Sequence, residues 1–593
     1  MANVDLLLKE FDALKSRRNL WEKMWELIAR YVLSRKQGFT FDTVPGEFFV
    51  HGDVYDDTAA LALNQMVSSL VGSLWKNGAR TFRIVKPDVV PETTEVKEYY
   101  AEINRRIVYQ MEHPRAGFVT SFQEYMAENG AFGTSGIGTF PTKQGSDHLV
   151  DYRALGLKHL WVCEDASGRV IKIFYVVKLN AFQLQEEYGD AVAGIDTVKK
   201  ALETSNYETL FDVLWVIRPR STYDPGKLKN NQNMAYESIH VLVKEKIEIR
   251  NSGFRSNPAK ITRFYKNEGE EYGRSPAMEA LPSIITANAF WEMITKATEK
   301  SLAPPLYLLD DGSFGGGIID TSPNALNVLD VSSRITNTAP IGVIGTVGEM
   351  QSAAKMIEAL NQQIIKHFFV DRLLDLNNQT RMTLGEAQIR NELRSDSLGS
   401  VFNRQIEECL TPTIERTIEI MVEAGEFGVV KGSEEEVKLR AMGQTPLLIP
   451  AELVQADLAK IEIYEIEYVS PAMRTLRSEE LRGLISTWQF AGTFGAVVPE
   501  FLLMLDKKKS LRLLADMSGA SSDVFVSDQE YEESLKNFMD MRQQQAQLEA
   551  QKAGAEIEAK KGSAAQQNAQ AVATQMGGAA AGGQGMAGGG MLL

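Results

Sequence analysis

The sequence predicts an α+β protein that is predominantly helical, and three observations carry this prediction. Before about residue 270, short β-branched and aromatic runs alternate with turn residues, as expected of strands among helices. Beyond that point, apolar residues at helical spacing dominate the chain. Two of these helical stretches flank a segment rich in glycine and β-branched residues, which predicts a small β-containing insertion between two helices.

Composition and charge restrict the class of protein. The 593 residues, 44% of them hydrophobic and 24% charged, suffice for several globular domains. No apolar run reaches the roughly 18 residues of a membrane span, and the amphipathic N-terminus does not read as a signal peptide, so we expect cytoplasmic synthesis and no membrane partner. Cys163 and Cys409 are expected to be buried free thiols. The net charge of −15 argues against a protein that grips nucleic acid, although not against one that nucleic acid slides past.

The N-terminal region is predicted to contain three helices and one strand. Residues 4–33 have an apolar face at helical spacing, and residues 56–75 form a second helix whose small side chains predict burial. A short strand ends at Pro87, and a polar helix follows over 92–113. The polar face of the first helix is filled by Arg17, Arg18 and Lys23.

Strand patterns dominate the next part of the chain. A helix beginning near Ser121 is expected to break at Asn129-Gly130 into a glycine-rich strand. Residues 157–178 are two β-rich runs around a turn at 165–168, the pattern of a hairpin. Further strands are expected at 211–218, 236–250 and 260–265.

The first helix of the central pair has clear boundaries. Ser275 can cap its N-terminus and Pro276 suits its first turn. Pro282 is expected to kink or restart the helix, and Pro304-Pro305 ends it. Its expected apolar face consists of Ile284, Ala287, Trp291, Ile294 and Thr298.

The second helix of the pair is expected over 347–370. A polar loop then leads to a capping box of Thr383 and Glu386, which starts a long helix ending at Gly425. Pro412 lies inside that helix and should kink it.

The C-terminal part begins with a strand inside 447–468 and a helical region over 478–517. Residues 527–562 form a helix rich in Gln, Glu and Lys, which either packs into a helical barrel with neighbouring copies or stays a solvated tail. The uncharged Ala-, Gly- and Gln-rich residues 563–593 are predicted to be disordered.

A search for catalytic motifs points away from an enzyme. The loop GSFGGG lacks the Gly-Lys-Ser/Thr ending of a phosphate-binding P-loop, and no Gly-x-Ser-x-Gly motif occurs. None of the histidines has a His or Cys partner at metal-ligand spacing, so we expect each to be surface or structural, with no cofactor and no metal. The six are His51, His113, His148, His159, His240 and His367. An enzyme with an unrecognised nucleotide site and a structural scaffold protein stay open as alternatives.

The order of these parts resembles the portal (head-to-tail connector) family of tailed bacteriophages, closest to the short-tailed podovirus type. The resemblance is collinear over about residues 5–560. It rests on LALNQMVSSLVGSLW followed by TFRI, on LKHLWVCEDASGRVIKIFYVVK, on YGRSPAMEAL, and on TRMTLGEAQIRNEL followed by LGSVFNRQIEECLTPTIERTIEIM.

The resemblance implies a portal fold and a structural function without catalysis. Twelve subunits would form a ring at one capsid vertex of the virion, through which double-stranded DNA is packaged and ejected without sequence specificity. The implied partners are terminase, tail adaptor and tube proteins, and the major capsid, scaffolding and internal core proteins. The implied parts are an α/β wing (1–275), two stem helices (276–304 and 347–370), a clip (305–346), a channel loop (371–383), a long kinked wing/crown helix (384–430), a crown (431–526), a barrel helix (527–562) and a tail (563–593).

Two groups of residues follow from this alignment. Twelve copies of −15 sum to roughly −180, and such a like-charged wall keeps phosphates from sticking. The loop residues expected nearest DNA are Arg372, Asp375, Asn377, Asn378, Gln379 and Arg381, although both arginines could equally form inter-subunit salt bridges. The clip residues expected to dock partners are Gly312, Phe314, Gly316, Thr336, Asn337 and Pro340, although these loops could instead close the ring by β-pairing between neighbours.

Overall fold

A computed structural model gives the architecture of the chain. It describes residues 4–36, 38–41, 52–75, 81–87, 89–91, 93–142, 145–205, 207–224, 233–302, 306–308, 341–343, 350–371, 399, 401–441, 446–458, 464–468, 478–495, 510–511 and 528–577. The chain divides into two compact units, one of residues 1–87 and 99–520 and one of residues 88–98 and 521–593. Each unit is described by itself below.

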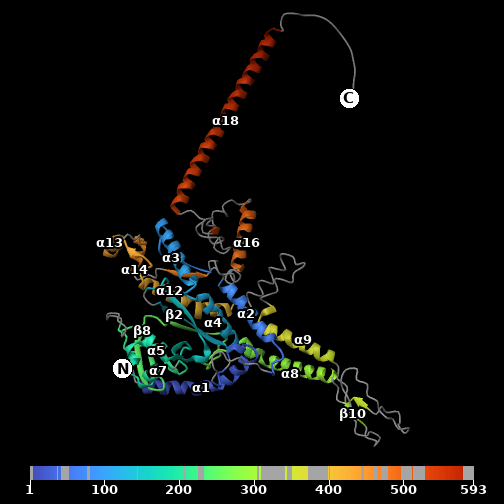
Figure 1. Ribbon diagram of the computed structural model, residues 1–593. Helices are drawn as coiled ribbons and strands as arrows, with labels where there is room; N and C mark the ends of the chain where they lie inside the picture. The colour runs from blue at the N-terminus through green and yellow to red at the C-terminus, as the bar shows by residue number, and fades with distance from the viewer. Residues whose placement is uncertain are drawn as a thin grey trace, which may run out of the picture. The chain divides into compact units, whose positions relative to one another are not determined.

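A five-stranded antiparallel sheet forms much of the N-terminal half (Figure 1). Its strands, in spatial order, are β4 (Leu160–Glu164), β5 (Val170–Asn180), β6 (Leu210–Pro219), β7 (Tyr236–Leu242) and β8 (Ile247–Phe254). The hairpin expected over 157–178 is confirmed as β4 and β5. The single strand expected over 236–250 was wrong, because a turn with Lys246 at φ 57° divides it into β7 and β8.

Helices cover both faces of this sheet, as the alternation of side chains along its strands requires. On one face, α1 (Val4–Tyr31) inserts Leu7, Phe11 and Leu14 between Phe174, Leu214 and other buried strand residues. On the other face, α5 (Ala181–Tyr188), α6 (Asp190–Ala193) and α7 (Asp196–Glu203) pack against Val213 and its neighbours. Leu214 and Val213 are adjacent in β6 and therefore belong to opposite cores.

One residue of α1 corrects the expected polar face. Arg18 is 1% exposed, donates hydrogen bonds to the carbonyl oxygens of Leu160 and Lys158 at 2.6 and 2.9 Å, and pairs with Glu22 at 3.0 Å. Its guanidinium lies 4.4 Å from the centre of the Trp161 ring. Burial of this charge is tolerated because two backbone carbonyls, Glu22 and the Trp161 ring surround the guanidinium.

A three-stranded antiparallel sheet lies beside two helices of the same unit. Its order is β3 (Val150–Leu155), β2 (Thr134–Pro141) and β9 (Ala259–Arg263), and α4 (Phe118–Phe132) packs on β2 and β3. The break expected at Asn129-Gly130 was wrong: α4 continues to Phe132 and ends at Gly133, whose φ is 79°. Gly130 stays helical because α2 (Thr58–Leu74) packs on it, and a Cβ there would come within 2.5 Å of the Met66 side chain.

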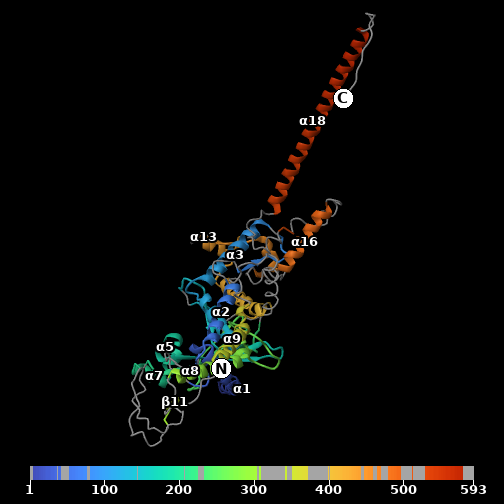
Figure 2. The same cartoon turned by 90° about the vertical axis from the view of Figure 1, so that its right-hand side faces the viewer.

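The predicted helix pair is present as two long helices separated by short strands. The helix α8 (Pro276–Leu302) begins at the expected residue and runs on through Pro282 without restarting. It leads into β10 (Leu306–Leu308), which pairs with β11 (Ile341–Val343), and α9 (Met350–His367) then returns beside α8 (Figures 1 and 2).

The predicted long helix is described at residue 399 and continuously from residue 401, and its middle is not α-helical. Residues 401–405 lead into a π-helical turn at Ile406–Leu410, and α12 (Thr411–Glu423) follows, with Pro412 in its first turn. The π-helical turn ends two residues before Pro412, which has no N–H to continue the α-helical ladder. The kink expected at this proline stays a prediction. The helix ends two residues before Gly425, the expected end.

The remaining C-terminal elements of the first unit are short. The predicted strand β14 (Glu465–Tyr468) is confirmed and pairs with β1 (Phe82–Val85), where Arg83 binds Glu467 at 2.8 Å. The strands β12 (Val429–Val430) and β13 (Leu448–Ile449) are parallel. The helices are α13 (Glu434–Ala441), α14 (Ala451–Leu458) and α16 (Ser478–Gly495).

In the second unit, α18 (Asp528–Gly577) is a 50-residue helix whose described side chains are exposed. It is about 75 Å long at the usual rise per residue. The prediction of disorder from Ser563 is wrong for 563–577, because Ala and Gln favour a helix and no Gly or Pro interrupts them before Gly577. The helix α3 (Thr94–Glu112) confirms the predicted polar helix and passes from this unit into the first.

Candidate functional site

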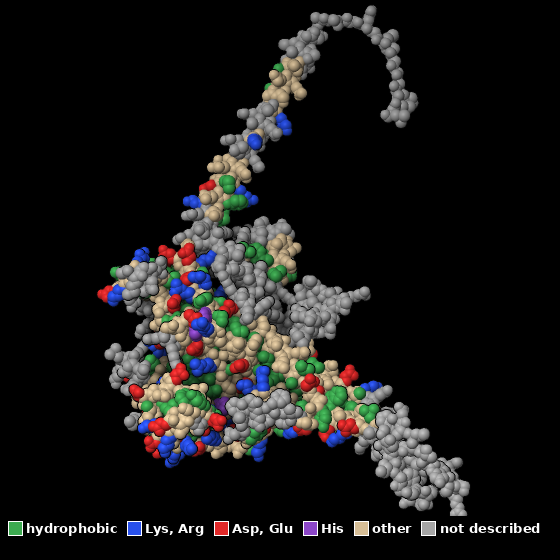
Figure 3. Space-filling view, viewed as in Figure 1, with side chains coloured by type: hydrophobic (Ala, Val, Ile, Leu, Met, Phe, Trp, Pro, Cys, Tyr) green, Lys and Arg blue, Asp and Glu red, His purple; other side chains and the backbone are tan. Residues whose placement is uncertain are grey.

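The helix pair α8–α9 leaves large apolar side chains exposed on this chain. Trp291, Met293 and Leu302 of α8 are 37%, 64% and 83% exposed, and Met356 of α9 is 48% exposed. Figure 3 shows hydrophobic side chains interspersed among charged ones over this part of the molecule. The expected apolar face of α8 is thus buried only near its start, at Ile284 and Ala287. These exposed large apolar side chains are available for contact with another protein surface.

The start of α8 is anchored to the junction between α4 and β2. The Ser275 hydroxyl accepts a hydrogen bond from the Met278 amide at 3.1 Å, which confirms the predicted cap, and donates to the Ala131 carbonyl at 2.7 Å. The Gly273 amide donates to the Thr134 hydroxyl at 2.7 Å. These bonds fix the direction in which α8 leaves the sheets.

Two glycines allow the backbone at the end of α4 to lie directly against the backbone before α8. A Cβ on Gly133 would lie 2.3 Å from the Gly273 carbonyl oxygen, and a Cβ on Gly273 would lie 2.3 Å from the Gly133 carbonyl oxygen. Gly133 also needs a positive φ to end α4. Neither glycine is recognisable from the sequence, because nothing local distinguishes the two from other loop glycines.

The π-helical turn packs on α4 and β9 through buried polar groups. The Tyr125 hydroxyl of α4 donates to the side-chain oxygen of Gln405 and accepts from Asn129 at 3.2 Å. Burial raises the pKa of the Cys409 thiol to about 12, so this cysteine is an unreactive core residue, as expected. Cys163, by contrast, is only partly buried, because its strand β4 lies at the edge of its sheet.

An ionic cluster connects the π-helical turn to the five-stranded sheet. Arg263 at the end of β9 is 5% exposed and bonds Glu164 of β4, while its backbone amide donates to Glu408 of the π-helical turn at 3.1 Å. Lys266 joins Glu164 at 2.7 Å. Both sheets and the long helix are therefore held to one another immediately before α8 begins.

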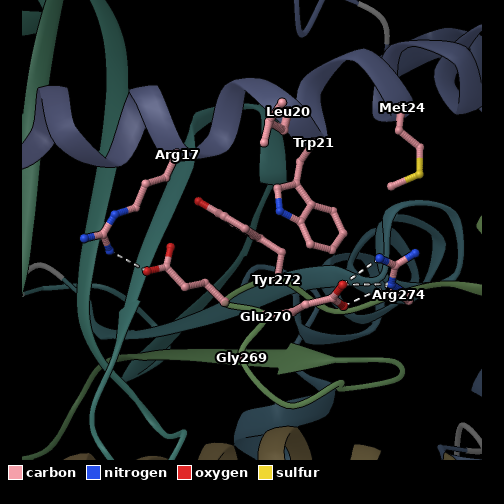
Figure 4. A pocket seen from close by; sticks show the side chains of 9 residues that line it. Arg17, Leu20, Trp21, Met24, Gly269, Glu270, Tyr272 and Arg274 are labelled. Carbon is pink, nitrogen blue, oxygen red and sulfur yellow. Dashed lines mark hydrogen bonds and ion pairs between the residues drawn. The ribbon is translucent and has the colours of Figure 1, made fainter.

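A surface pocket of about 560 Å³ lies between α1 and residues 269–274. Arg17 pairs with Glu271 at 2.9 Å and Arg274 with Glu270 at 2.6 Å, as Figure 4 shows around Trp21. Both carboxylates of the pocket lining are thus paired with arginines.

The residues predicted to approach DNA and to dock partners cannot be placed. The loop residues Arg372, Asp375, Asn377, Asn378, Gln379 and Arg381 lie outside the described residues. The same is true of the clip residues Gly312, Phe314, Gly316, Thr336, Asn337 and Pro340. The capping box of Thr383 and Glu386 lies outside them as well.

The structure brings together two histidines that the sequence left scattered. His113 follows α3, and His148 precedes β3, and their rings stack with centres 5.2 Å apart. Asp147 lies beside both. Sequence spacing could not reveal the pair, since 35 positions separate the two histidines. The only local signal was the clustering of Asp147, His148 and Asp151 within five residues.

No helix within the described ranges is both long and apolar enough to cross a membrane.

Comparisons with known proteins agree over nearly the whole chain. The family described as bacteriophage head to tail connecting protein matches residues 4–526. The chain is 27% identical over 573 residues to the probable portal protein of Bordetella phage BPP-1, covering 94% of this chain and 95% of that protein. It is 24% identical to the portal protein of Salmonella phage epsilon15, covering 91% of each. Among solved structures, a chain from the virion of a native gene transfer agent particle is 10% identical with a TM-score of 0.29, covering 66% of this chain and 91% of that one.

Proposed function

The chain belongs to the family of bacteriophage head to tail connecting proteins, and from this membership we propose that it is a phage portal protein. Copies of the chain form a ring at one vertex of the capsid in the virion, and double-stranded DNA enters and leaves through its central channel. The role is structural rather than enzymatic. Subunit number, terminase and tail partners, and synthesis in the host cytoplasm are parts of this proposal.

The observation that carries the proposal is the helix pair α8–α9 with its exposed apolar side chains, placed within a family match that spans residues 4–526. A single chain leaves the side chains of Met293 and Leu302 in water. A neighbouring subunit that covered them would gain about 25 cal/mol of free energy for each Å² of apolar surface buried. Packing beside identical copies around an axis covers this surface. In that arrangement α8 and α9 are the stem, and β10, β11 and the segment between them are the clip that docks terminase and then tail proteins.

Assembly of the purified protein tests the ring. We expect electron micrographs of the wild-type chain to show rings with a central hole. Met293→Asp and Leu302→Asp should shift the sedimenting species to monomer, because each places a charge in the apolar contact. Leu20→Asp is the matched control, since Leu20 is 82% exposed on α1, close to the 83% of Leu302. Wild-type monomers, or rings that persist in the stem variants, would refute the proposal.

For the channel we propose that residues 371–383 form the loop nearest to DNA, with Arg372 and Arg381 at its two ends. The acidic balance of the chain supports weak, sequence-independent passage of the duplex. Deletion of 374–380 should leave rings intact and reduce DNA retention after packaging. Unchanged packaging and retention would assign these arginines to contacts between subunits instead.

For α18 we propose a helical barrel built from neighbouring copies. Phe538, Met539 and Met541 are 55%, 62% and 62% exposed on the single helix, so neighbours would gain by covering them. Removal of 528–577 should lower the thermal stability of rings but not of monomers. An equal effect on both species would indicate a solvated tail.

A further inference from the structure

The cluster formed by His113, Asp147 and His148 has the donor set of a transition-metal site. One potential ligand atom from each of the three side chains lies within 4.8 Å of the others. Two imidazole nitrogens and a carboxylate oxygen are ligands that Zn²⁺ takes readily, whereas Ca²⁺ and Mg²⁺ prefer oxygen alone. His148 is 8% exposed and Asp147 is 48% exposed, so the cluster is held by the fold on one side and open to solvent on the other.

The hydrogen bonds of His148 already have the arrangement found around metal-bound histidines. Its Nε2 lies 2.9 Å from Oδ1 of Asp151, and its Nδ1 lies 2.9 Å from Oδ1 of Asp147. A neutral imidazole carries one proton, so when Nε2–H donates to Asp151, the Nδ1 lone pair is directed at the Asp147 carboxylate. A divalent ion bound by Nδ1 and this carboxylate replaces that contact between two acceptors. Nε2–H then continues to donate to Asp151, as a ligand histidine usually does to a carboxylate.

We propose that His113, Asp147 and His148 bind one Zn²⁺ per chain, with Asp151 as the carboxylate that orients His148. The ion ties the connection between β2 and β3 to the residue that follows α3. It adds to the hydrogen bond from the Leu149 amide to Gln110 at 3.1 Å and to the stacking of the two histidine rings. The fourth position is left to water, as in other three-ligand zinc sites.

Binding requires a small adjustment that the structure allows. The Nε2 atom of His113 is 3.9 Å from Oδ2 of Asp147, and the two rings lie nearly parallel, at 13°. His113 therefore turns about its Cβ–Cγ bond to aim Nε2 at the ion and gives up the 3.3 Å contact from the Arg115 amide, which is long for a hydrogen bond. Arg115 also pairs with Asp147 at 2.9 Å, so its positive charge competes with the ion for this carboxylate.

Calorimetric titration of the chelator-treated full-length protein with ZnCl₂ tests the site, and Co²⁺ absorbance in the visible range reports the geometry. We expect one equivalent per chain for the wild type and for His367→Gln, a matched control that removes a histidine from the end of α9. His113→Gln should abolish stoichiometric binding, and Asp151→Asn should weaken it about 10–100-fold while leaving the stoichiometry unchanged.

Arg115→Gln distinguishes a metal site from a cluster that is merely structural. Removing the competing cation should tighten Zn²⁺ binding about two- to fivefold, the equivalent of an exposed ion pair. Its side chain is 72% exposed, so the variant is expected to fold, and circular dichroism verifies this for each protein. Equal Zn²⁺ affinity in the wild type and in His113→Gln, or binding well below one equivalent, would overturn the proposal.

Discussion

The close contact between Gly133 and Gly273 at the start of α8 can be tested by adding a single methyl group. In Gly133→Ala the new Cβ would lie 2.3 Å from the Gly273 carbonyl oxygen and 2.6 Å from the Arg274 carbonyl carbon. Both obstacles are backbone atoms, so no side-chain rotation relieves the overlap. The backbone at the end of α4 or at the start of α8 must move.

Two contributions make up the expected loss. Gly133 has a φ of 79°, and an alanine in the left-handed region costs roughly 1–2 kcal/mol. A carbon and a carbonyl oxygen normally stay about 3.3 Å apart, so the backbone must shift by about 1 Å, and overpacking of this kind costs about 1–3 kcal/mol. Gly133→Ala should therefore lower the free energy of unfolding by about 2–5 kcal/mol.

Gly425→Ala separates the two contributions. Gly425 has the same φ of 79°, but nothing lies within 4 Å of an added Cβ. This variant should lose only the roughly 1–2 kcal/mol of backbone strain. Urea unfolding followed by circular dichroism measures both variants, and micrographs show whether rings still form. Equal losses in the two variants would refute the claim that the contact of Gly133 with Gly273 holds the start of α8 in place.

Three further outcomes are expected from unfolding measurements. Ser275→Ala should cost about 1–3 kcal/mol, because a buried cap of α8 is lost together with its second hydrogen bond; an unchanged midpoint would contradict the anchorage. Arg18→Met should cost about 3–5 kcal/mol by stranding its acceptors, while the exposed Arg17→Met should cost little. Burial lowers the pKa of His159 to about 4 and that of His240 to about 3, from 6.5. Below pH 6.5 the unfolded chain therefore binds more protons than the folded chain. As the pH falls from 6.5 to 4, the free energy of unfolding should decrease by at most about 1.4 kcal/mol per pH unit for each histidine. A free energy of unfolding that does not change over this range would contradict the expectation.

Much of the fold follows from local patterns. The apolar spacing of α1, the capping of α8 by Ser275 and the hairpin of β4 and β5 were all predictable, because each depends on residues close together in the chain. The family resemblance extended this reading to function, because the order of the elements is itself a feature of the sequence.

Contacts between distant residues were decided only in the folded chain. Gly130 looked like a helix breaker, yet it stays helical because α2 approaches it so closely that only a glycine fits. Arg18 looked like a surface residue, yet carbonyl groups some 140 positions away supply its acceptors. His113 and His148 became neighbours because the end of α3 meets the start of β3.

What this sequence determined by itself is the succession of helices and strands and the family to which they belong, since periodicity and capping act over a few residues. Which glycines must remain glycines, which charges are buried and which donor atoms converge depended on tertiary packing. The physical reason is that these properties arise from distances between segments, and no local pattern encodes such a distance.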